Sequence, residues 1–204
     1  TDLAGTVAVV KQGGVVQTIA PLTVTNDSIT GDLSGLADGT YTIEVTTMDV
    51  AGNTTTKTQS VVIDATAPTL TLGALADSKL TNAQAGSYSQ SYTTSDNTAV
   101  ASTVAVVKNA DGVKQTAITL TTTGGNVAGN LSSLAEGTYT IEVTATDTAG
   151  NTTVKTQEVV IDKTAPTLTL DALTDSQLTF AEAKIYTQTF TTADNTGGTG
   201  LAST

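Results

Sequence analysis

Apolar and polar residues alternate with a period of two along much of this chain. In residues 139–145 the apolar side chains belong to Tyr139, Ile141, Val143 and Ala145, with Thr and Glu between them. Because successive side chains of a β-strand point to opposite faces, this pattern predicts a strand with one buried and one solvated face. Similar patterns predict six further strands, at residues 69–72, 88–95, 101–108, 115–122, 127–131 and 153–161.

Short turns rich in Asn, Asp and Gly separate these strands. Residues 109–112, Asn-Ala-Asp-Gly, predict a hairpin between strands 101–108 and 115–122, and residues 148–151, Thr-Ala-Gly-Asn, turn the chain before 153–161. Seven short antiparallel strands in about one hundred residues are typical of two sheets packed face to face. We therefore expect an all-β sandwich.

The pattern is repeated. Residues 39–64 recur as residues 137–162 with five differences, and residues 61–72, VVIDATAPTLTL, recur as residues 159–170 with only Ala65 replaced by Lys163. Each copy contains a strand, an acidic residue, a Thr-Ala-Pro hinge and a new strand. This order is expected at a junction between successive β-domains.

The repeat divides the chain into three parts. Residues 65–162 are expected to form a complete repeat, residues 1–64 the C-terminal part of one, and residues 163–204 the N-terminal part of another. We expect a window of a longer array. The alternative is that residues 163–204 of one molecule complete residues 1–64 of the next, which would give self-association into a head-to-tail polymer.

The amino-acid composition restricts the classes of function that are expected. The net charge is −11, with eight Lys and no Arg, which argues against nucleic acid as a partner. The absence of His and Cys removes the usual general base, thiol nucleophile and zinc ligands, so we expect no enzyme. No run of apolar residues reaches the length of a membrane-spanning helix, so no membrane insertion is expected in this segment.

Two motifs carry a family resemblance. GTYTIEVTATDTAGN (137–151) and VVIDKTAPTLTL (159–170) together resemble the bacterial immunoglobulin-like repeats of giant secreted adhesins and biofilm-associated proteins of Gram-negative bacteria. The resemblance implies tandem seven-stranded, Greek-key immunoglobulin-like sandwiches in an elongated array. It also implies neighbouring repeats of the same chain as partners, type I secretion to the cell surface, and Ca²⁺ at the domain junctions. The Leu-x-x-Gly-Thr-Tyr motifs at residues 36–41 and 134–139 have the placement of a tyrosine corner.

Acidic residues are expected at one pole of the complete repeat. In an immunoglobulin-like strand order, the linker Asp64, the loop with Asp96 and Asn97, and the loop with Asp147 and Asn151 meet at that pole. Carboxylates gathered without a basic partner repel one another unless a cation lies between them, and Ca²⁺ takes oxygen ligands of these kinds. Each motif alone is also typical of an ordinary turn. The candidate ligands are Asp64, Asp96, Asn97, Asp147 and Asn151, then Asp162, Asp194 and Asn195 at the next junction, and Asp49 and Asn53 as the remnant of the preceding one.

The predicted role is mechanical. We expect a stalk segment of a cell-surface adhesin, made rigid by Ca²⁺ at the junctions and supporting cell adhesion and biofilm formation. The alternative is a module that binds glycan or a flat surface through rows of exposed Thr, such as Thr138, Thr140 and Thr144. β-Propensity alone also places Thr on a solvated face, and glycan sites usually need aromatic platforms.

Overall fold

The computed structural model describes residues 3–25, 28–173, 176–183 and 185–195. These residues form mainly β-strands, which confirms the all-β prediction. Their backbones pack into two compact units. The first contains the residues up to Pro68 together with the loops Ser95–Ala101 and Thr146–Thr152, and the second contains the rest.

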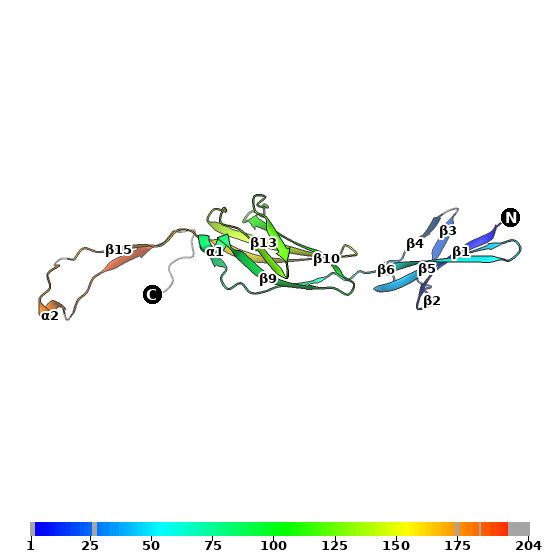
Figure 1. Ribbon diagram of the computed structural model, residues 1–204, viewed down its shortest axis with the longest axis horizontal. Helices are drawn as coiled ribbons and strands as arrows, with labels where there is room; N and C mark the ends of the chain where they lie inside the picture. The colour runs from blue at the N-terminus through cyan, green and yellow to red at the C-terminus, as the bar shows by residue number, and fades with distance from the viewer. Residues whose placement is uncertain (1–2, 26–27, 174–175, 184, 196–204) are drawn as a thin grey trace. The chain divides into compact units, whose positions relative to one another are not determined.

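The first unit is built on a four-stranded sheet in the order β2-β1-β5-β6. Its strands are β1 (Leu3–Gln12), β2 (Val15–Val16), β5 (Gly39–Asp49) and β6 (Thr54–Ile63), shown from blue to cyan in Figure 1. A hairpin of β3 (Leu22–Thr25) and β4 (Ser28–Gly31) accompanies this sheet. Its buried apolar cluster is small, and consists of Val10, Ala20, Leu36 and Tyr41.

The second unit contains the complete sandwich, drawn mainly in green and yellow in Figure 1. One sheet has the order β10-β13-β14-β8 and the other the order β11-β12-β9-β7. The strands of the first sheet are β8 (Lys79–Leu80), β10 (Val100–Asn109), β13 (Gly137–Asp147) and β14 (Thr152–Ile161). Those of the second are β7 (Thr69–Leu72), β9 (Tyr88–Ser95), β11 (Leu120–Thr123) and β12 (Asn126–Gly129).

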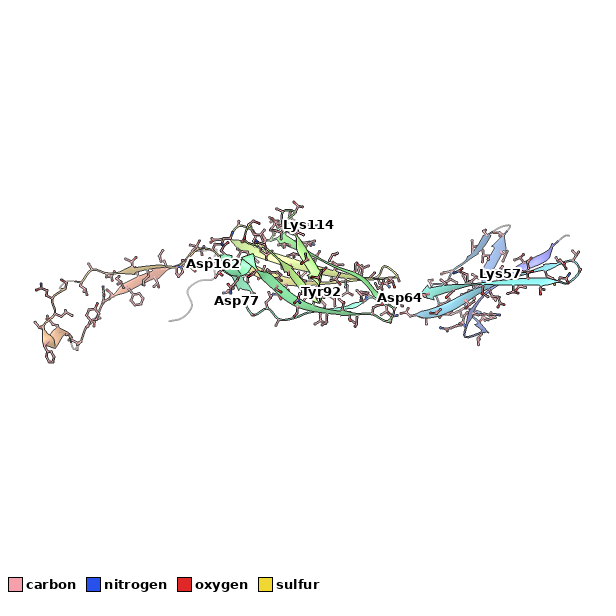
Figure 2. The ribbon with its side chains drawn as sticks, viewed as in Figure 1. Lys57, Asp64, Asp77, Tyr92, Lys114 and Asp162 are labelled. Carbon is pink, nitrogen blue, oxygen red and sulfur yellow. The ribbon has the colours of Figure 1, made fainter. Side chains whose placement is uncertain are left out.

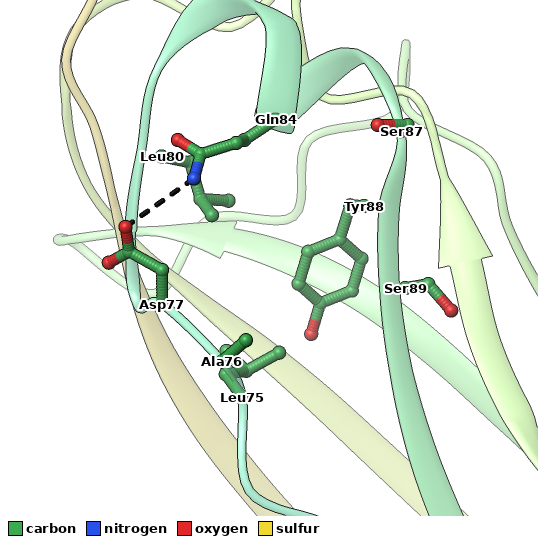
Figure 3. Close-up of a pocket in the computed structure, with 8 residues that line it drawn as sticks. All are labelled: Leu75, Ala76, Asp77, Leu80, Gln84, Ser87, Tyr88 and Ser89. Carbon is green, nitrogen blue, oxygen red and sulfur yellow. Dashed lines mark hydrogen bonds between the residues drawn. The ribbon is translucent and has the colours of Figure 1, made fainter.

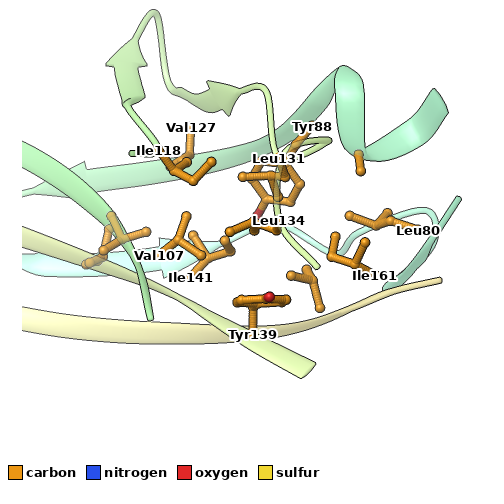
Figure 4. Packing of buried hydrophobic residues seen from close by; sticks show 14 of the residues in the cluster. Leu80, Tyr88, Val107, Ile118, Val127, Leu131, Leu134, Tyr139, Ile141 and Ile161 are labelled. Carbon is orange, nitrogen blue, oxygen red and sulfur yellow. The ribbon is translucent and has the colours of Figure 1, made fainter. Parts of the chain in front are cut away.

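The core lies between these two sheets. The side chains of β13 alternate between buried and partly exposed from Tyr139 to Asp147, as the sequence predicts. Figure 4 shows Val107 and Ile141 from one sheet facing Val127 from the other. Since the cluster is built from Val, Ile, Leu, Ala and two Tyr, its stability rests on the area of aliphatic surface that the two sheets remove from water.

Two details differ from the sequence prediction. The complete repeat has eight strands, because the short β8 pairs in parallel with β14, with Leu80 opposite Ile161. The one-turn helix α1 (Asn82–Gly86) follows β8, and Thr81 caps it. These elements close the sheet edge beside β14, where alternation gave no signal because β8 is only two residues long.

The predicted strand 115–122 is also wrong. The turn at residues 109–112 forms, with Gly112 at a φ of 77°, but the hairpin ends at the bridge between Lys108 and Lys114. The chain then crosses to the other sheet, and β11 begins only at Leu120. Ile118 and Leu120 gave the false alternation, since both face the core although only Leu120 belongs to a strand.

Both tyrosine corners are present. The Tyr41 hydroxyl donates to the Ala37 carbonyl at 2.8 Å, and the Tyr139 hydroxyl donates to the Ala135 carbonyl at 3.2 Å. Each bond ties the start of a long strand to the turn before it.

After Asp162, the structure describes β15 (Thr167–Leu170), α2 (Phe180–Ala183) and β16 (Phe190–Ala193). β15 and β16 pair antiparallel, with Leu168 opposite Thr192. Their side chains are exposed.

Candidate metal centre

Three aspartates from distant parts of the sequence come together in the first unit. Asp64 follows β6 (Figure 2), Asp96 follows β9, and Asp147 ends β13. One carboxylate oxygen of each lies within 4.8 Å of the others. No ion pair of the described residues involves these three side chains. Their negative charges therefore face one another without a basic partner.

Asp147 is held rigidly by its own loop. Its Oδ1 accepts the backbone N–H groups of Ala149, Gly150 and Asn151 at 2.7 to 2.9 Å, and Gly150 has a φ of 101°. Its side chain is only 2% exposed. Burial acts to raise the pKa of Asp147, but the hydrogen bonds from Asn151, Gly150 and Ala149 outweigh it, so the pKa lies below its usual value. Asp147 is therefore a fixed carboxylate at neutral pH.

One oxygen of Asp96 has no hydrogen-bond partner among the described residues. Its Oδ2 accepts from the backbone N–H and the hydroxyl of Thr98, at 2.9 and 2.8 Å. Its Oδ1 is buried and accepts no hydrogen bond from any residue that the structure describes. Buried polar atoms normally have a partner, so an oxygen of this kind beside two other carboxylates fits a bound cation.

Thr98 also ties Asp64 into the cluster. Its hydroxyl lies 2.5 Å from Asp64 Oδ2 and contacts Asp96 as well. A single hydroxyl hydrogen can serve only one of these oxygens at a time.

The amide side chains that the sequence suggested as ligands lie at the cluster as donors. Asn97 Nδ2 donates to Asp64 Oδ1 at 3.2 Å. Asn151 Nδ2 donates to Asp147 Oδ2 at 2.8 Å, and also faces the carbonyls of Asp64 and Thr66. In this arrangement the two amides donate hydrogen bonds to two of the carboxylates, and Asn151 also contacts the linker backbone.

The oxygens at this pole fit a hard divalent cation. All three carboxylates offer oxygen ligands, the Thr98 hydroxyl lies beside two of them, and one carboxylate oxygen is buried without a hydrogen-bond partner among the described residues. Ca²⁺ binds such ligands in flexible arrangements of about six to eight oxygens. Asp64, Asp96 and Asp147 are the residues that would hold it.

The next junction repeats part of this arrangement in the second unit. Asp162 follows β14 (Figure 2), and its Oδ1 accepts the Thr164 N–H at 3.2 Å. Asp194 Oδ1 and Asn195 Oδ1 are buried and accept no hydrogen bond from the described residues. Asp49 and Asn53 bond to each other, with Asn53 Nδ2 donating to Asp49 Oδ2 at 2.9 Å, as the corresponding loop of the preceding repeat should.

Sequence reasoning missed one acid at each junction. Asp38, in the turn before β5, contacts the linker and Asn97, and Glu136 takes the same place before β13. The signal was available in the corner motif, which reads Leu-Ala-Asp-Gly at residues 36–39 and Leu-Ala-Glu-Gly at residues 134–137. The motif thus places an acid at the same position before β5 and before β13.

A small pocket in the second unit offers no comparable chemistry. Its volume is about 200 Å³, and Figure 3 shows Leu75, Asp77, Gln84 and Tyr88 among the residues that line it. Asp77 already accepts hydrogen bonds from Gln84 and the Lys79 N–H. Tyr88 is buried and bonds Gln90, and burial raises the pKa of its hydroxyl. The ring is therefore not available as an exposed stacking platform.

Family models identify the repeats. Residues 66–164 match a model described as a bacterial Ig-like domain, and residues 5–65 match a second model with the same description. Residues 5–164 therefore belong to bacterial immunoglobulin-like domains in tandem, as the two sequence motifs indicated. No curated protein matches this sequence.

Solved structures with similar folds include two adhesins. A tetra-tandem repeat from the extending region of a large adhesion protein is 28% identical, with 84% of this chain and 46% of that chain covered and a TM-score of 0.40. A Ca²⁺-stabilised adhesin with which an Antarctic bacterium binds ice is 25% identical, with 83% and 44% covered and a TM-score of 0.35. This chain spans less than half the length of either.

A third similar structure comes from another class of protein. The fibronectin(III)-like modules of CbhA from Clostridium thermocellum are 18% identical, with 76% of each chain covered and a TM-score of 0.45. In the described part of this chain, neither α1 nor α2 has the length and apolar character needed to cross a membrane.

Proposed function

We propose that this chain is a stalk segment of a bacterial cell-surface adhesin, in which Ca²⁺ bound at the junctions fixes the orientation of successive immunoglobulin-like repeats. The observation that carries the proposal is the group formed by Asp64, Asp96 and Asp147, whose carboxylates lie within 4.8 Å of one another. The buried Asp96 Oδ1 supports it, because no described residue supplies a hydrogen bond to that oxygen.

The origin of the three carboxylates gives the mechanism. Asp64 belongs to the linker, and Asp96 and Asp147 belong to two loops of the repeat that follows. A Thr-Ala-Pro hinge can adopt several backbone conformations. A cation bound by all three residues would restrict the hinge to one of these conformations. Extracellular Ca²⁺ sites bind at about 0.1 to 1 mM, so calcium outside the cell would keep the junctions rigid and its removal would release them.

The proposal includes the domain division and the place of action. Residues 65–162 are the complete repeat, and residues 1–64 and 163–204 belong to the repeats before and after it. The neighbouring repeats of the same chain are its main partners. An adhesin stalk acts at the cell surface after secretion by a type I system, and it would support biofilm formation by carrying adhesive domains away from the cell. Its contribution is mechanical and involves no catalysis.

Small-angle scattering of the full chain tests the proposal. With 5 mM Ca²⁺ the radius of gyration should be larger than in EDTA, and Asp64→Asn should remove the difference. Asp111→Asn, in the turn at residues 109–112, is the matched control and should keep it. The same radius of gyration with and without calcium would contradict the proposal. A concentration series in the same experiment reveals head-to-tail self-association, which would favour the strand-exchanged polymer.

The second candidate is a module that binds glycan or a repeating surface. It is favoured by a Thr row on β5 and β6, where Thr46 and Thr56 are hydrogen-bonded at 2.8 Å and the side chains from Thr54 to Ser60 are exposed. Adsorption to a glycan array that persists in EDTA and is lost on replacing Thr54, Thr56 and Thr58 by Lys would support this function. Adsorption that needs calcium would favour the stalk.

A further inference from the structure

The turn before β5 carries an acid that contacts residues beyond its own repeat. Asp38 lies next to Gly39, whose φ of 155° gives the backbone a conformation that favours glycine. Asp38 Oδ1 accepts the N–H of Ala65 at 2.8 Å. Its Oδ2 accepts the hydroxyl of Thr66 and, at 3.3 Å, Asn97 Nδ2. One carboxylate thus contacts the linker and a loop of the repeat that follows.

The second junction has the same contacts with a longer side chain. Glu136 Oε1 accepts the N–H of Lys163 at 2.9 Å and the Thr164 hydroxyl at 2.6 Å. Its Oε2 accepts Asn195 Nδ2 at 2.8 Å. Asp38 and Glu136 differ by one methylene and still reach corresponding partners. The same contacts therefore form at both junctions although the two side chains differ in length.

The repeat that follows holds the other side of the linker backbone. Asn151 Nδ2 lies 3.1 Å from the Asp64 carbonyl and 3.3 Å from the Thr66 carbonyl. One of its N–H groups is directed to Asp147 Oδ2, and the other is shared between these two carbonyls. Asp38 accepts a hydrogen bond from a backbone N–H of the linker, and Asn151 contacts linker carbonyls as a donor. Residues 64–66 are thus held from both neighbouring repeats by hydrogen bonds that do not require a metal ion.

We propose that Asp38 and Glu136 are positioning residues, by which each repeat holds the linker that leaves it and restricts the linker conformations before a metal binds, so that a cation would then fix the orientation of the repeat that follows. The inference rests on the proposed role of the junctions but not on calcium. In this arrangement the linker aspartate is presented to the following loops before any cation arrives, which lowers the entropy that cation binding must remove.

The negative charge of both acids and a further contact of Lys163 support the positioning role. The Thr66 hydroxyl and the Ala65 N–H hold the pKa of Asp38 below its usual value, and the Thr164 hydroxyl and the Lys163 N–H do the same for Glu136. Both acids are therefore charged at neutral pH. At the second junction the Lys163 ammonium also donates to the carbonyls of Ser132 and Leu134, at 2.6 and 2.5 Å. That lysine fastens the linker to the turn region that carries Glu136.

Hydrogen exchange of the Ala65 amide in EDTA tests the proposal, using the full chain. Asp38→Ala should speed this exchange about 10-fold, because a charge-assisted hydrogen bond is lost. Asp38→Glu should leave the rate within about 2-fold of the wild type, since Glu136 makes the same contacts. Asp32→Ala is the matched control, because Asp32 bonds the Ser34 N–H inside its own turn, and it should leave Ala65 unchanged. Protection in the middle of β5 reports that each variant is folded.

Spin-label distances provide a second readout. The chain contains no Cys, so labels at Lys57→Cys and Lys155→Cys, both exposed, are specific. In EDTA, Asp38→Ala should broaden the distance distribution and Asp32→Ala should not. An Ala65 exchange rate and a distance distribution that are both unaffected by Asp38→Ala would overturn the proposal. If calcium changes nothing in either experiment but Asp38→Ala has both effects, the positioning role stands and the calcium function falls.

Discussion

β5 and β13 have almost the same sequence and different surroundings. Residues 39–49, GTYTIEVTTMD, and residues 137–147, GTYTIEVTATD, differ at two positions. Both form an eleven-residue strand with a tyrosine corner at its start. Yet Ile141, Val143 and Ala145 have no exposed surface in β13, whereas Ile43, Val45 and Thr47 in β5 are only partly buried.

The difference comes from what covers each strand. A complete second sheet, β11-β12-β9-β7, contributes Leu70, Tyr88 and Val127 to the core over β13. Among the described residues of the first unit, the β3-β4 hairpin accompanies the sheet, and the buried apolar cluster comprises Val10, Ala20, Leu36 and Tyr41. The local sequence therefore specifies the strand and its tyrosine corner. Burial of the same side chain depends on residues remote in sequence.

The largest expected effect is on the aliphatic core. Ile141→Ala should lower the free energy of unfolding of the complete repeat by about 2–5 kcal/mol, because it leaves a cavity in a closed core. Ile43→Ala should cost about 1 kcal/mol, since part of that side chain is already in water. Urea denaturation, with hydrogen exchange assigning the loss to each strand, measures both. Equal losses would mean that β5 is covered as fully as β13 in solution.

The next effect is on the acids that end the two strands. Asp147→Asn should weaken calcium binding at least about 10-fold, as one of the three carboxylates is lost while the amide oxygen still accepts the loop N–H groups. Asp49→Asn is the matched control in the same loop sequence, and it should leave the affinity at the Asp64 junction unchanged. Isothermal titration calorimetry distinguishes them. A similar loss in both variants would show that the junction is not the binding site.

The tyrosine corners should respond alike in both strands. Tyr41→Phe and Tyr139→Phe each remove one hydroxyl-to-carbonyl hydrogen bond, worth about 1 kcal/mol. Both partners lie four residues away in sequence, so the loss should not depend on the second sheet. Denaturant midpoints of the two variants provide the comparison, and a loss confined to Tyr139→Phe would refute a purely local corner.

The smallest effect is expected on the solvated faces. Lys11 pairs with Glu44 and Lys108 with Glu142, at 2.6 Å in both cases. These side chains are partly exposed, so Lys11→Ala and Lys108→Ala should each change the free energy of unfolding by less than about 1 kcal/mol. Raising the salt concentration should reduce even that difference. A salt-independent loss above this value would point to packing of the Lys stem.

The candidate site could be predicted in outline. The repeated linker identified Asp64, and immunoglobulin-like connectivity placed the loops of Asp96 and Asp147 at the same pole. The orientation of the amides could not be predicted, because Asn97 and Asn151 can accept or donate and only their neighbours in space decide which. The corner motif shows the acid Asp38, but its role was missed because its partners lie 27 or more residues away in the sequence.

The long strands, the corners, the repeat and the acids Asp64, Asp96 and Asp147 can be recognised from the chain alone, since they depend on alternation, turn chemistry and contacts a few residues apart. The crossing of residues 115–119 between the sheets, the parallel pairing of Leu80 with Ile161 and the contact of Asp38 with the linker are known from the folded structure. These features depend on which surfaces pack together, and residues far apart in sequence supply those surfaces. β5 and β13 are nearly identical in sequence, yet their inward side chains are buried to different extents because different residues cover them.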